Sequence, residues 1–276
     1  MKSLRFAFAF GALGLSALSF STDVSVNFSQ YYTSYESSNP YSNVGSIDID
    51  KKQEDAFGYA KTSGTVAPGL IKLKVESHLE QGTTPLYNYA GQYVTGTFGD
   101  EVIPTGGSVG TSGKLTPVVN LSGLLSASSS ALSNPEDYPS ASYGLSIVLS
   151  RFPNRQTAGA NGQFIGGVFT GDALPKSFTP EFDIIFGESY YLSVSLSVST
   201  QTRLDPANNS GWWSTASSDF SHTVQWGGAS AKDQFGAPVS GFSLVGSGGN
   251  NWAQPVPEPS SMIALALGGL AVLRRR

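Results

Sequence analysis

A glycine-rich stretch between residues 106 and 110 carries the spacing of a hydrolase nucleophile. Gly106-Gly107-Ser108-Val109-Gly110 matches the pattern G-x-S-x-G, in which a serine is exposed on a sharp turn between a strand and a helix. No apolar strand pattern leads into this stretch, and no helical pattern follows it. The two histidines that could serve as a base, His78 and His222, lie in polar, strand-like contexts. The sequence therefore predicts a flexible glycine loop and structural histidines, and we expect no catalytic residue.

Carboxylates gather between Asp48 and Asp55, and such clusters can bind calcium. The glycine and the glutamate that a calcium-binding loop needs at its sixth and twelfth positions are missing. Lys51 and Lys52 stand among the acids and would repel a cation. The chain has no cysteine, which excludes thiolate zinc sites, iron–sulfur clusters, thiol catalysis and disulfide scaffolds. We expect a solvated charged turn, with neither a metal nor a cofactor.

Two adjacent tryptophans, Trp212 and Trp213, follow a short run of Asn and Ser. Aromatic faces beside polar side chains can stack on sugar rings. Residues 205–216 are thus a candidate polysaccharide-binding loop, with Trp212 and Trp213 as the stacking residues. The alternative is that the tryptophans are buried in the core or cover an open end of it.

The overall composition excludes further classes of function. Charged residues make up 13% of the 276 residues, about half the usual share. The formal net charge is −4 and the pI is about 5.2. Nucleic-acid binders draw their affinity from Lys and Arg on phosphates, so we expect no nucleic-acid partner. The 16 Phe, 12 Tyr and 4 Trp are enough to build a core, which argues against disorder.

The candidate residues lie among segments in which apolar and polar residues alternate. Between Tyr191 and Ser199, apolar residues and serines take strictly alternate positions, as in a strand with one buried and one solvated face. Turn formers such as Pro68-Gly69 and Gly227-Gly228 stand between such segments. Further alternating segments are residues 24–29, 71–76 and 145–150, and shorter candidates are 164–169, 182–186, 220–226 and 239–245. The sequence predicts an all-β fold, an antiparallel β-sandwich.

A serine-rich, low-complexity stretch runs from Leu121 to Ser133. Its composition predicts a loop or linker between an early part, residues 22–120, and a later part, residues 134–250. Each part has about the length of a small sandwich. We favour one sandwich over residues 22–250 with a long connection, and two domains split near residues 121–133 are the alternative.

The first 21 residues have the order of a secretory signal peptide. Lys2 and Arg5 precede an apolar run over residues 6–18, and small residues follow. The run is shorter than the roughly 20 residues that a spanning helix needs. We therefore expect passage through the secretion machinery and cleavage by a signal peptidase after Ser19 or Ser21.

Residues 251–276 form a second targeting segment. Val256-Pro257-Glu258-Pro259 is followed by an apolar stretch over residues 262–273 and then by Arg274, Arg275 and Arg276. The apolar stretch predicts a short transmembrane helix of about 18 Å. The terminal arginines favour the cytoplasmic side for that end. The precursor is thus expected to be anchored transiently in the membrane with its body outside.

This C-terminal arrangement resembles the PEP-CTERM sorting signal, which occurs in Gram-negative bacteria that make extracellular polysaccharide. In that family the tail is removed by an exosortase, a membrane-bound, transpeptidase-like enzyme. The resemblance implies an exosortase-type partner, processing directed by Val256, Pro257, Glu258 and Pro259, and anchoring by Arg274, Arg275 and Arg276. It also implies transient residence in the inner membrane, and then a place at the cell surface or in the extracellular matrix. Residues 186–196, 219–226 and 242–245 are similar to the last strands of family members with jelly-roll-like sandwiches.

The body of residues 22–259 holds 11 basic and 20 acidic residues, a net charge of −9. Such a charge favours solubility outside the cell. We expect a non-enzymatic, exported protein with a structural or biofilm role in the exopolysaccharide matrix. The alternative is a carbohydrate-binding, lectin-like surface module that uses Trp212 and Trp213.

Overall fold

The computed structural model describes residues 23–31, 35–38, 41–42, 45–80, 88–130, 138–204 and 212–256. No segment in these ranges is helical, and so none of them could cross a bilayer as a helix. The signal peptide expected over residues 1–21 and the segment from Pro257 to Arg276 lie outside the described residues.

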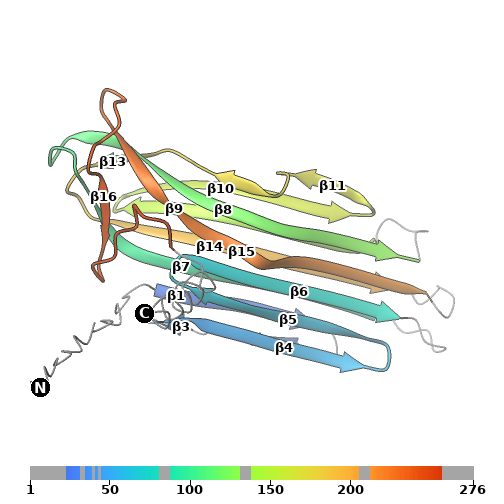
Figure 1. The fold of residues 1–276 in the computed structure, drawn as a ribbon. Helices are drawn as coiled ribbons and strands as arrows, with labels where there is room; N and C mark the ends of the chain where they lie inside the picture. Colours follow the sequence, from blue (N-terminus) through green and yellow to red (C-terminus); the bar gives the residue numbers. More distant parts are fainter. Residues whose placement is uncertain are drawn as a thin grey trace, which may run out of the picture.

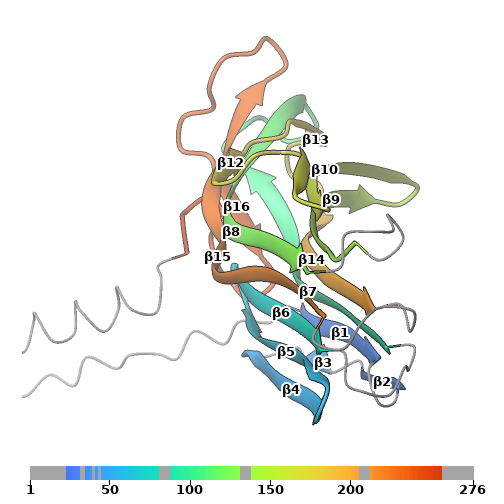
Figure 2. The same cartoon turned by 90° about the vertical axis from the view of Figure 1, so that its right-hand side faces the viewer.

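The strands form two antiparallel sheets that face each other (Figures 1 and 2). Sheet A contains β1 (Asp23–Tyr31), β2 (Tyr35–Ser38), β3 (Tyr41–Ser42), β7 (Asn88–Thr105), β9 (Ser140–Arg151), β10 (Asn154–Ile165), β11 (Val168–Gly171), β14 (Tyr190–Leu204) and β16 (Ser243–Gly246). Sheet B contains β4 (Ile47–Asp55), β5 (Gly58–Ala67), β6 (Leu70–Glu80), β8 (Ser112–Ser129), β12 (Lys176–Phe178), β13 (Phe182–Ile185) and β15 (Trp213–Asp233). The predicted all-β sandwich is confirmed.

The order of the strands interleaves the two parts of the chain. Sheet A runs β11-β10-β9-β14-β7-β1-β2, with β16 also paired to β7 and β3 to β1. Sheet B runs β12-β8-β15-β6-β5-β4, with β13 also paired to β8. In each sheet, a strand from the later part of the chain therefore lies directly beside one from the early part.

β14 shows why alternation predicts these strands correctly. Leu192, Val194, Leu196 and Val198 are all buried, and the serines between them are half-buried on the outer face. The segments predicted at 24–29, 71–76 and 145–150 lie in β1, β6 and β9. The shorter candidate at 164–169 is wrong as a single strand, because Gly166 and Gly167 have φ values of +55° and +85° and form the turn between β10 and β11.

The serine-rich stretch predicted as a linker is a strand over most of its length. Residues 121–129 belong to β8, and their partners on β15 are themselves rich in serine, as in the pair Ser126–Ser217. The prediction is wrong because the ladder satisfies the backbone groups of both strands, whatever the composition of the side chains. Leu121 and Leu125 supply the buried side chains of this part of β8.

The core between the sheets has two chemically different ends. Near β16 it is aromatic, and the Trp252 ring is stacked on Phe98 at a centroid distance of 5.9 Å and meets the edge of Trp226 at 5.8 Å. Toward the end where β15 begins, the buried residues include Ser77, Thr200, Thr202 and Ser214. The aromatic end is the one against which the last described residues pack.

Candidate functional site

The described chain ends in a segment that is part of the sandwich. Residues 250–256, here called the C-terminal strap, follow β16 and lie along β15. Trp252 in the strap is 4% exposed and belongs to the main hydrophobic core, and Val256 packs against the same core. The packed residues therefore continue past the predicted boundary at residue 250, through the buried Trp252 to Val256.

Trp252 is fixed by hydrogen bonds as well as by packing. Its indole Nε1 donates to the Asp100 carboxylate over 2.7 Å, and its carbonyl oxygen accepts from Nε1 of Trp226 over 2.7 Å. Its backbone N–H donates to the carbonyl of Leu244 over 2.8 Å. Asp100 is 3% exposed and also accepts from the hydroxyl of Ser247 over 2.6 Å. The indole N–H, the Asp100 carboxylate and the Ser247 hydroxyl are thus paired, as burial requires. The buried side-chain nitrogen of Asn250 in the same strap has no hydrogen-bond partner among the described residues.

Val256, the first residue of the predicted sorting motif, is held at both of its backbone polar groups. Its N–H donates to the carbonyl of Trp226 over 3.2 Å, and its carbonyl accepts from the side-chain amide of Gln225 over 2.8 Å. The strap therefore joins the fold up to the last residue before Pro257.

Two glycines, Gly69 and Gly228, leave room for the strap to lie against the sandwich. A Cβ on Gly69 would lie 2.6 Å from a methyl carbon of Val256, and one on Gly228 would lie 2.7 Å from the carbonyl oxygen of Ala253. Both glycines have positive φ values, +74° and +95°. Gly227-Gly228 was predicted as a turn, but it lies inside β15, where the absence of a side chain makes room for the strap.

Ser108 and His78 are not brought together, and the side chain of His222 lies outside the described part of the structure. Ser108 is exposed in the turn after β7, close to the start of β8. His78 lies on β6, opposite Thr215 of β15, which in turn pairs with Ser128 at the far end of β8. At the usual rise, the intervening part of β8 is about 50 Å of strand, so Ser108 and His78 lie toward opposite ends of β8. His78 instead lies beside the ring of Tyr59, at a centroid distance of 5.6 Å.

The carboxylates between Asp48 and Asp55 are spread along β4, the edge strand of sheet B. Asp48 accepts a hydrogen bond from Thr65 over 2.6 Å, and Glu54 forms an ion pair with Lys52 at 2.5 Å. The expected charged turn is thus an exposed strand. Within the described ranges, no three His, Cys, Asp or Glu side chains converge in a way that could hold a metal ion.

The two adjacent tryptophans lie in different environments. Trp212 is half-buried and packs on Leu79, Ala90 and Leu204 at the end of the core. Trp213 is 39% exposed, and its backbone N–H donates to the Ser130 hydroxyl over 2.8 Å. The alternation of β15 places Trp213 on the outer face of sheet B, since the next residue is buried. Trp212 thus covers an end of the sandwich, and Trp213 is the member of the pair that stays exposed.

The outer face of sheet A carries hydroxyl groups in register across the strands. Thr97 on β7 and Ser195 on β14 are cross-strand partners with their oxygens 2.9 Å apart, and Thr95 and Ser197 form the next pair at 2.7 Å. We call this surface the hydroxyl face and define it by Tyr93, Thr95, Thr97, Ser142, Tyr191, Ser195, Ser197 and Ser199. The sequence predicted its outward serines on β14, but not their partners on β7.

Two tyrosines border these hydroxyl pairs. Tyr93 is 45% exposed and accepts a hydrogen bond from Thr95 over 2.7 Å. Tyr191 is 39% exposed and lies over Gly99, where a Cβ would be 2.6 Å from the tyrosine oxygen. Tyr191 therefore leans along the sheet toward Gly99, close to the hydroxyl pairs of β7 and β14.

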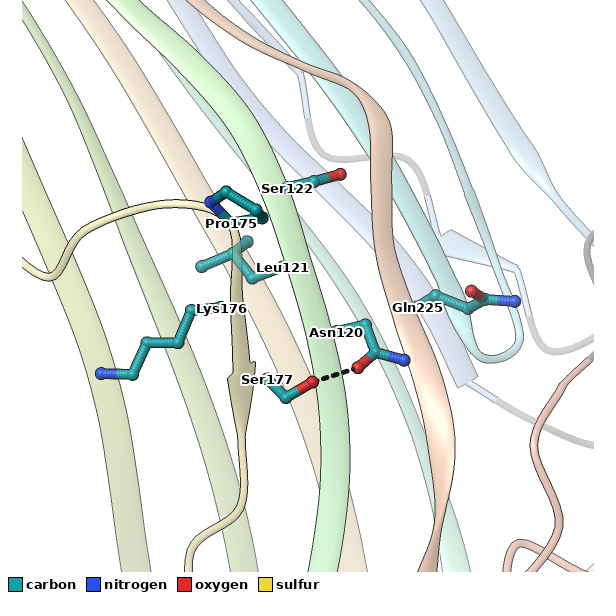
Figure 3. A pocket seen from close by; sticks show the side chains of 7 residues that line it. All are labelled: Asn120, Leu121, Ser122, Pro175, Lys176, Ser177 and Gln225. Atoms are coloured by element: carbon teal, nitrogen blue, oxygen red, sulfur yellow. Dashed lines mark hydrogen bonds between the residues drawn. The ribbon is translucent and has the colours of Figure 1, made fainter.

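A pocket of about 390 Å³ opens on sheet B (Figure 3). Ser177 of β12 donates to the side-chain oxygen of Asn120 on β8 over 2.6 Å. Gln225, which holds the carbonyl of Val256, lines the same pocket. Lys176 at its rim is paired with Asp172 at 2.5 Å. The hydrogen bond from Lys176 lowers the pKa of the Asp172 carboxyl, assisted by the backbone N–H of Asn161.

Residues 255–276 match the model of the PEP-CTERM protein-sorting motif. The chain carries a PEP-CTERM sorting signal. The motif implies an exported protein that an exosortase processes and sorts to the cell surface. The predicted resemblance is confirmed, and the matched PEP-CTERM region begins inside the strap, at Pro255.

The other comparisons add little to the PEP-CTERM match. No curated protein matches the chain. Among solved structures, one described as a carbohydrate-binding module from the β-sandwich superfamily aligns with 73% of this chain and 85% of its own. The sequence identity is 10% and the TM-score is 0.14, which is too low to support an inference about fold or ligand.

Proposed function

We propose that this protein is a non-catalytic component of the cell surface or of the exopolysaccharide matrix, delivered there by exosortase processing. The observation that carries the proposal is the PEP-CTERM motif directly behind a folded β-sandwich. The separation of Ser108 from His78 speaks against a hydrolase that would use these two residues together, and in this way supports the proposal.

The proposal is tested by replacing Pro257, Glu258 and Pro259 with alanine in cells that produce the protein. We expect the variant to keep its tail and to stay with the inner membrane, because the exosortase no longer reads the signal. Intact mass and cell fractionation measure both effects. A control with alanine at Gln234 and Phe235, which are exposed in the turn after β15 and lie outside the matched motif, should be processed normally. Normal mature protein from the triple variant would contradict the proposal.

Carbohydrate binding is the second candidate function, and the hydroxyl face favours it. The Thr97–Ser195 pair uses one donor and one acceptor internally, which leaves one donor and further lone pairs. In the Thr95–Ser197 pair, Thr95 donates to Tyr93 and so accepts from Ser197, which leaves lone pairs but no donor on this pair. Sugar hydroxyls need both kinds of partner. Tyr and Ser also combine a rigid contact area with adaptable hydrogen bonds at a low cost in conformational entropy.

The charge of the hydroxyl face selects the class of carbohydrate. In the four cross-strand rows from Tyr93 to Gly99, none of the described positions on β7, β14, β9 and β10 is charged. Charged residues border this uncharged part: Asp23 of β1 lies in the Gly99 row, and Glu101 and Arg155 lie in the row of Tyr191. The charges of an anionic polymer would lose hydration water on binding, and an uncharged surface offers no opposite charge to compensate for that loss. We therefore propose a neutral polysaccharide as the ligand of this second function.

Affinity electrophoresis of the full chain in gels that contain a neutral glucan, a galactomannan or alginate tests this candidate. We expect at least one neutral polymer to retard the protein and alginate to have no effect. Replacing Tyr93 and Tyr191 with alanine should weaken retardation at least tenfold. Tyr59→Ala on the outer face of sheet B is the matched control. Trp213→Ala tests the predicted indole contact in the same gels. Loss of retardation with this variant alone would assign binding to Trp213 instead.

A further inference from the structure

A small pocket opens where β13 of sheet B lies beside β10 of sheet A. Its volume is about 210 Å³, below the roughly 300–1,000 Å³ of sites for drug-sized ligands. We call it the edge pocket, and its lining includes Leu149, Arg151, Gln156, Asp183, Ile184 and Tyr190. These residues come from four strands, β9, β10, β13 and β14. The size of the edge pocket suits one small ring rather than a segment of a polymer.

The buried part of the lining is apolar. Leu149, Ile184 and Tyr190 all belong to the main hydrophobic core. Alternation along β14 turns Tyr190 inward and its neighbour Tyr191 outward, so the edge pocket and the hydroxyl face lie on opposite sides of sheet A. Buried aromatic and aliphatic side chains favour a ligand with one apolar face, such as the C–H face of a sugar ring.

The hydroxyl of Tyr190 has a donor to spare. Tyr190 is 6% exposed, and its oxygen accepts from the backbone N–H of Ile185 over 2.7 Å. A tyrosine hydroxyl can donate as well as accept, but this one donates to no group among the described residues. A buried donor without an acceptor costs free energy. The Tyr190 hydroxyl therefore favours an oxygen of a molecule bound in the edge pocket.

Arg151 offers further donors to the same space. Its Nη2 atom lies 3.0 Å from the carboxylate of Glu188. A guanidinium group has five N–H donors in a rigid fork, and one contact leaves several of them for a second acceptor. Arg151 and Tyr190 together can thus bind two oxygens of one ligand.

Gln156 fixes the wall between the two sheets. Its Nε2 donates to the carbonyl of Asp183 over 2.7 Å, and its Oε1 accepts from the N–H of Asp183 over 2.7 Å. The side-chain amide thus pairs with β13 as a neighbouring strand would. A wall that is fixed before binding lowers the conformational entropy lost when a ligand enters.

The charges of the lining already have partners. Arg151 is paired with Glu188, and Asp183 is paired with Lys114 at 2.6 Å. A charged ligand would lose hydration water in the edge pocket without finding an unpaired opposite charge there. The edge pocket therefore favours a neutral ligand that carries hydroxyl groups.

We propose that the edge pocket binds a single neutral sugar residue, with ring hydroxyls on Tyr190 and Arg151 and a C–H face on the buried apolar side chains. This inference rests on the carbohydrate-binding candidate and adds a second surface to it. The hydroxyl face would contact a length of polymer, whereas the edge pocket takes one ring.

Saturation-transfer NMR of the full chain tests the proposal with the methyl α-glycosides of glucose, galactose and mannose, and with glucuronate as the charged comparison. We expect at least one neutral glycoside to bind and glucuronate to show no transfer. Tyr190→Phe removes the spare donor, and the dissociation constant should rise about tenfold. Tyr143→Phe is the matched control, because this buried tyrosine donates to the carbonyl of Asp172 outside the edge pocket.

A second variant is needed because Tyr190→Phe also removes the acceptor of the Ile185 N–H. Arg151→Gln should raise the dissociation constant about fivefold. Lys232→Gln, which breaks a similarly exposed ion pair with Glu181 outside the edge pocket, should not change it. Unchanged binding in a folded Tyr190→Phe or in Arg151→Gln would overturn the proposal. Equal binding of glucuronate, or no binding of any of the three neutral glycosides, would do so too.

The edge pocket and the hydroxyl face can fail separately. The double variant with alanine at Tyr93 and Tyr191 should lose retardation by the polymer but still bind the glycoside. Glycoside binding without retardation by any neutral polymer would remove the hydroxyl face as a binding surface and support the edge pocket. Retardation without glycoside binding would remove the edge pocket and leave the second candidate function in place.

Discussion

Asp100 is a single residue whose substitution we expect to destabilise the protein clearly. It is a buried carboxylate that accepts hydrogen bonds from two segments distant from it in the sequence. It accepts from the indole of Trp252, from the N–H of Ser247 over 3.2 Å and from the Ser247 hydroxyl. Hydrogen bonds to a charged acceptor are stronger than those between neutral groups. This one side chain therefore ties β7 to the strap and to the turn before it.

We expect Asp100→Asn to lower the free energy of unfolding by about 2 kcal/mol, since the amide turns one of its NH₂ donors toward groups that are donors themselves. Urea denaturation measures the loss. Asp183→Asn is the control, because that carboxylate is exposed and pairs with Lys114 at the surface, so its midpoint should hardly change. Equal midpoints for Asp100→Asn and the wild type would contradict the role given to Asp100.

At the scale of elements, charges link the central strands of sheet B on its outer face. Lys74 of β6 lies 2.9 Å from Glu76 and 3.2 Å from Asp219 of β15. The hydrogen bond to Glu76 raises the pKa of Lys74, against the effect of burial and with help from Asp219. Burial acts to raise the pKa of Asp219, but hydrogen bonds from Ser221 and Lys74 outweigh it and lower that pKa.

A lowered pKa in the folded state means that Asp219 stabilises the protein when it is ionised. This contribution is present above the ordinary carboxyl pKa of 3.8 and is lost as the pH falls through the lower folded value. We expect Asp219→Asn to cost about 1 kcal/mol at neutral pH and almost nothing near pH 2. Urea midpoints at the two pH values measure the difference. A deficit of the same size at both would contradict an electrostatic origin.

Strand elements were predictable where alternation is local, and less so where serine replaces apolar residues. β6, β9 and β14 follow from their own residues, because a period of two needs no knowledge of the partner. β8 was missed over residues 121–129, since its pairing with β15 is a long-range property. The PEP-CTERM signal was found because all of its parts are contiguous, whereas the strap depends on Trp252 meeting Asp100, 152 residues away.

The same distinction holds for the candidate binding surfaces. Adjacent tryptophans suggested one aromatic platform, but strand alternation sends Trp213 outward, and packing on Leu79 and Leu204 draws Trp212 toward the core. The hydroxyl face could not be assembled from sequence alone, because the partners Thr97 and Ser195 are 98 residues apart. The jelly-roll-like connectivity that the resemblance implies stays a prediction.

At the scale of the whole molecule, the exposed charges of β4 affect whether two copies can associate through this edge strand. A free strand edge offers unpaired backbone groups on which a second chain can grow by adding its own strand. Here that edge displays Asp50, Lys51 and Lys52, with further acids on either side. A neighbour would have to strip water from these charges before its backbone could join the ladder. The β4 edge of sheet B thus disfavours the addition of a strand from a second copy.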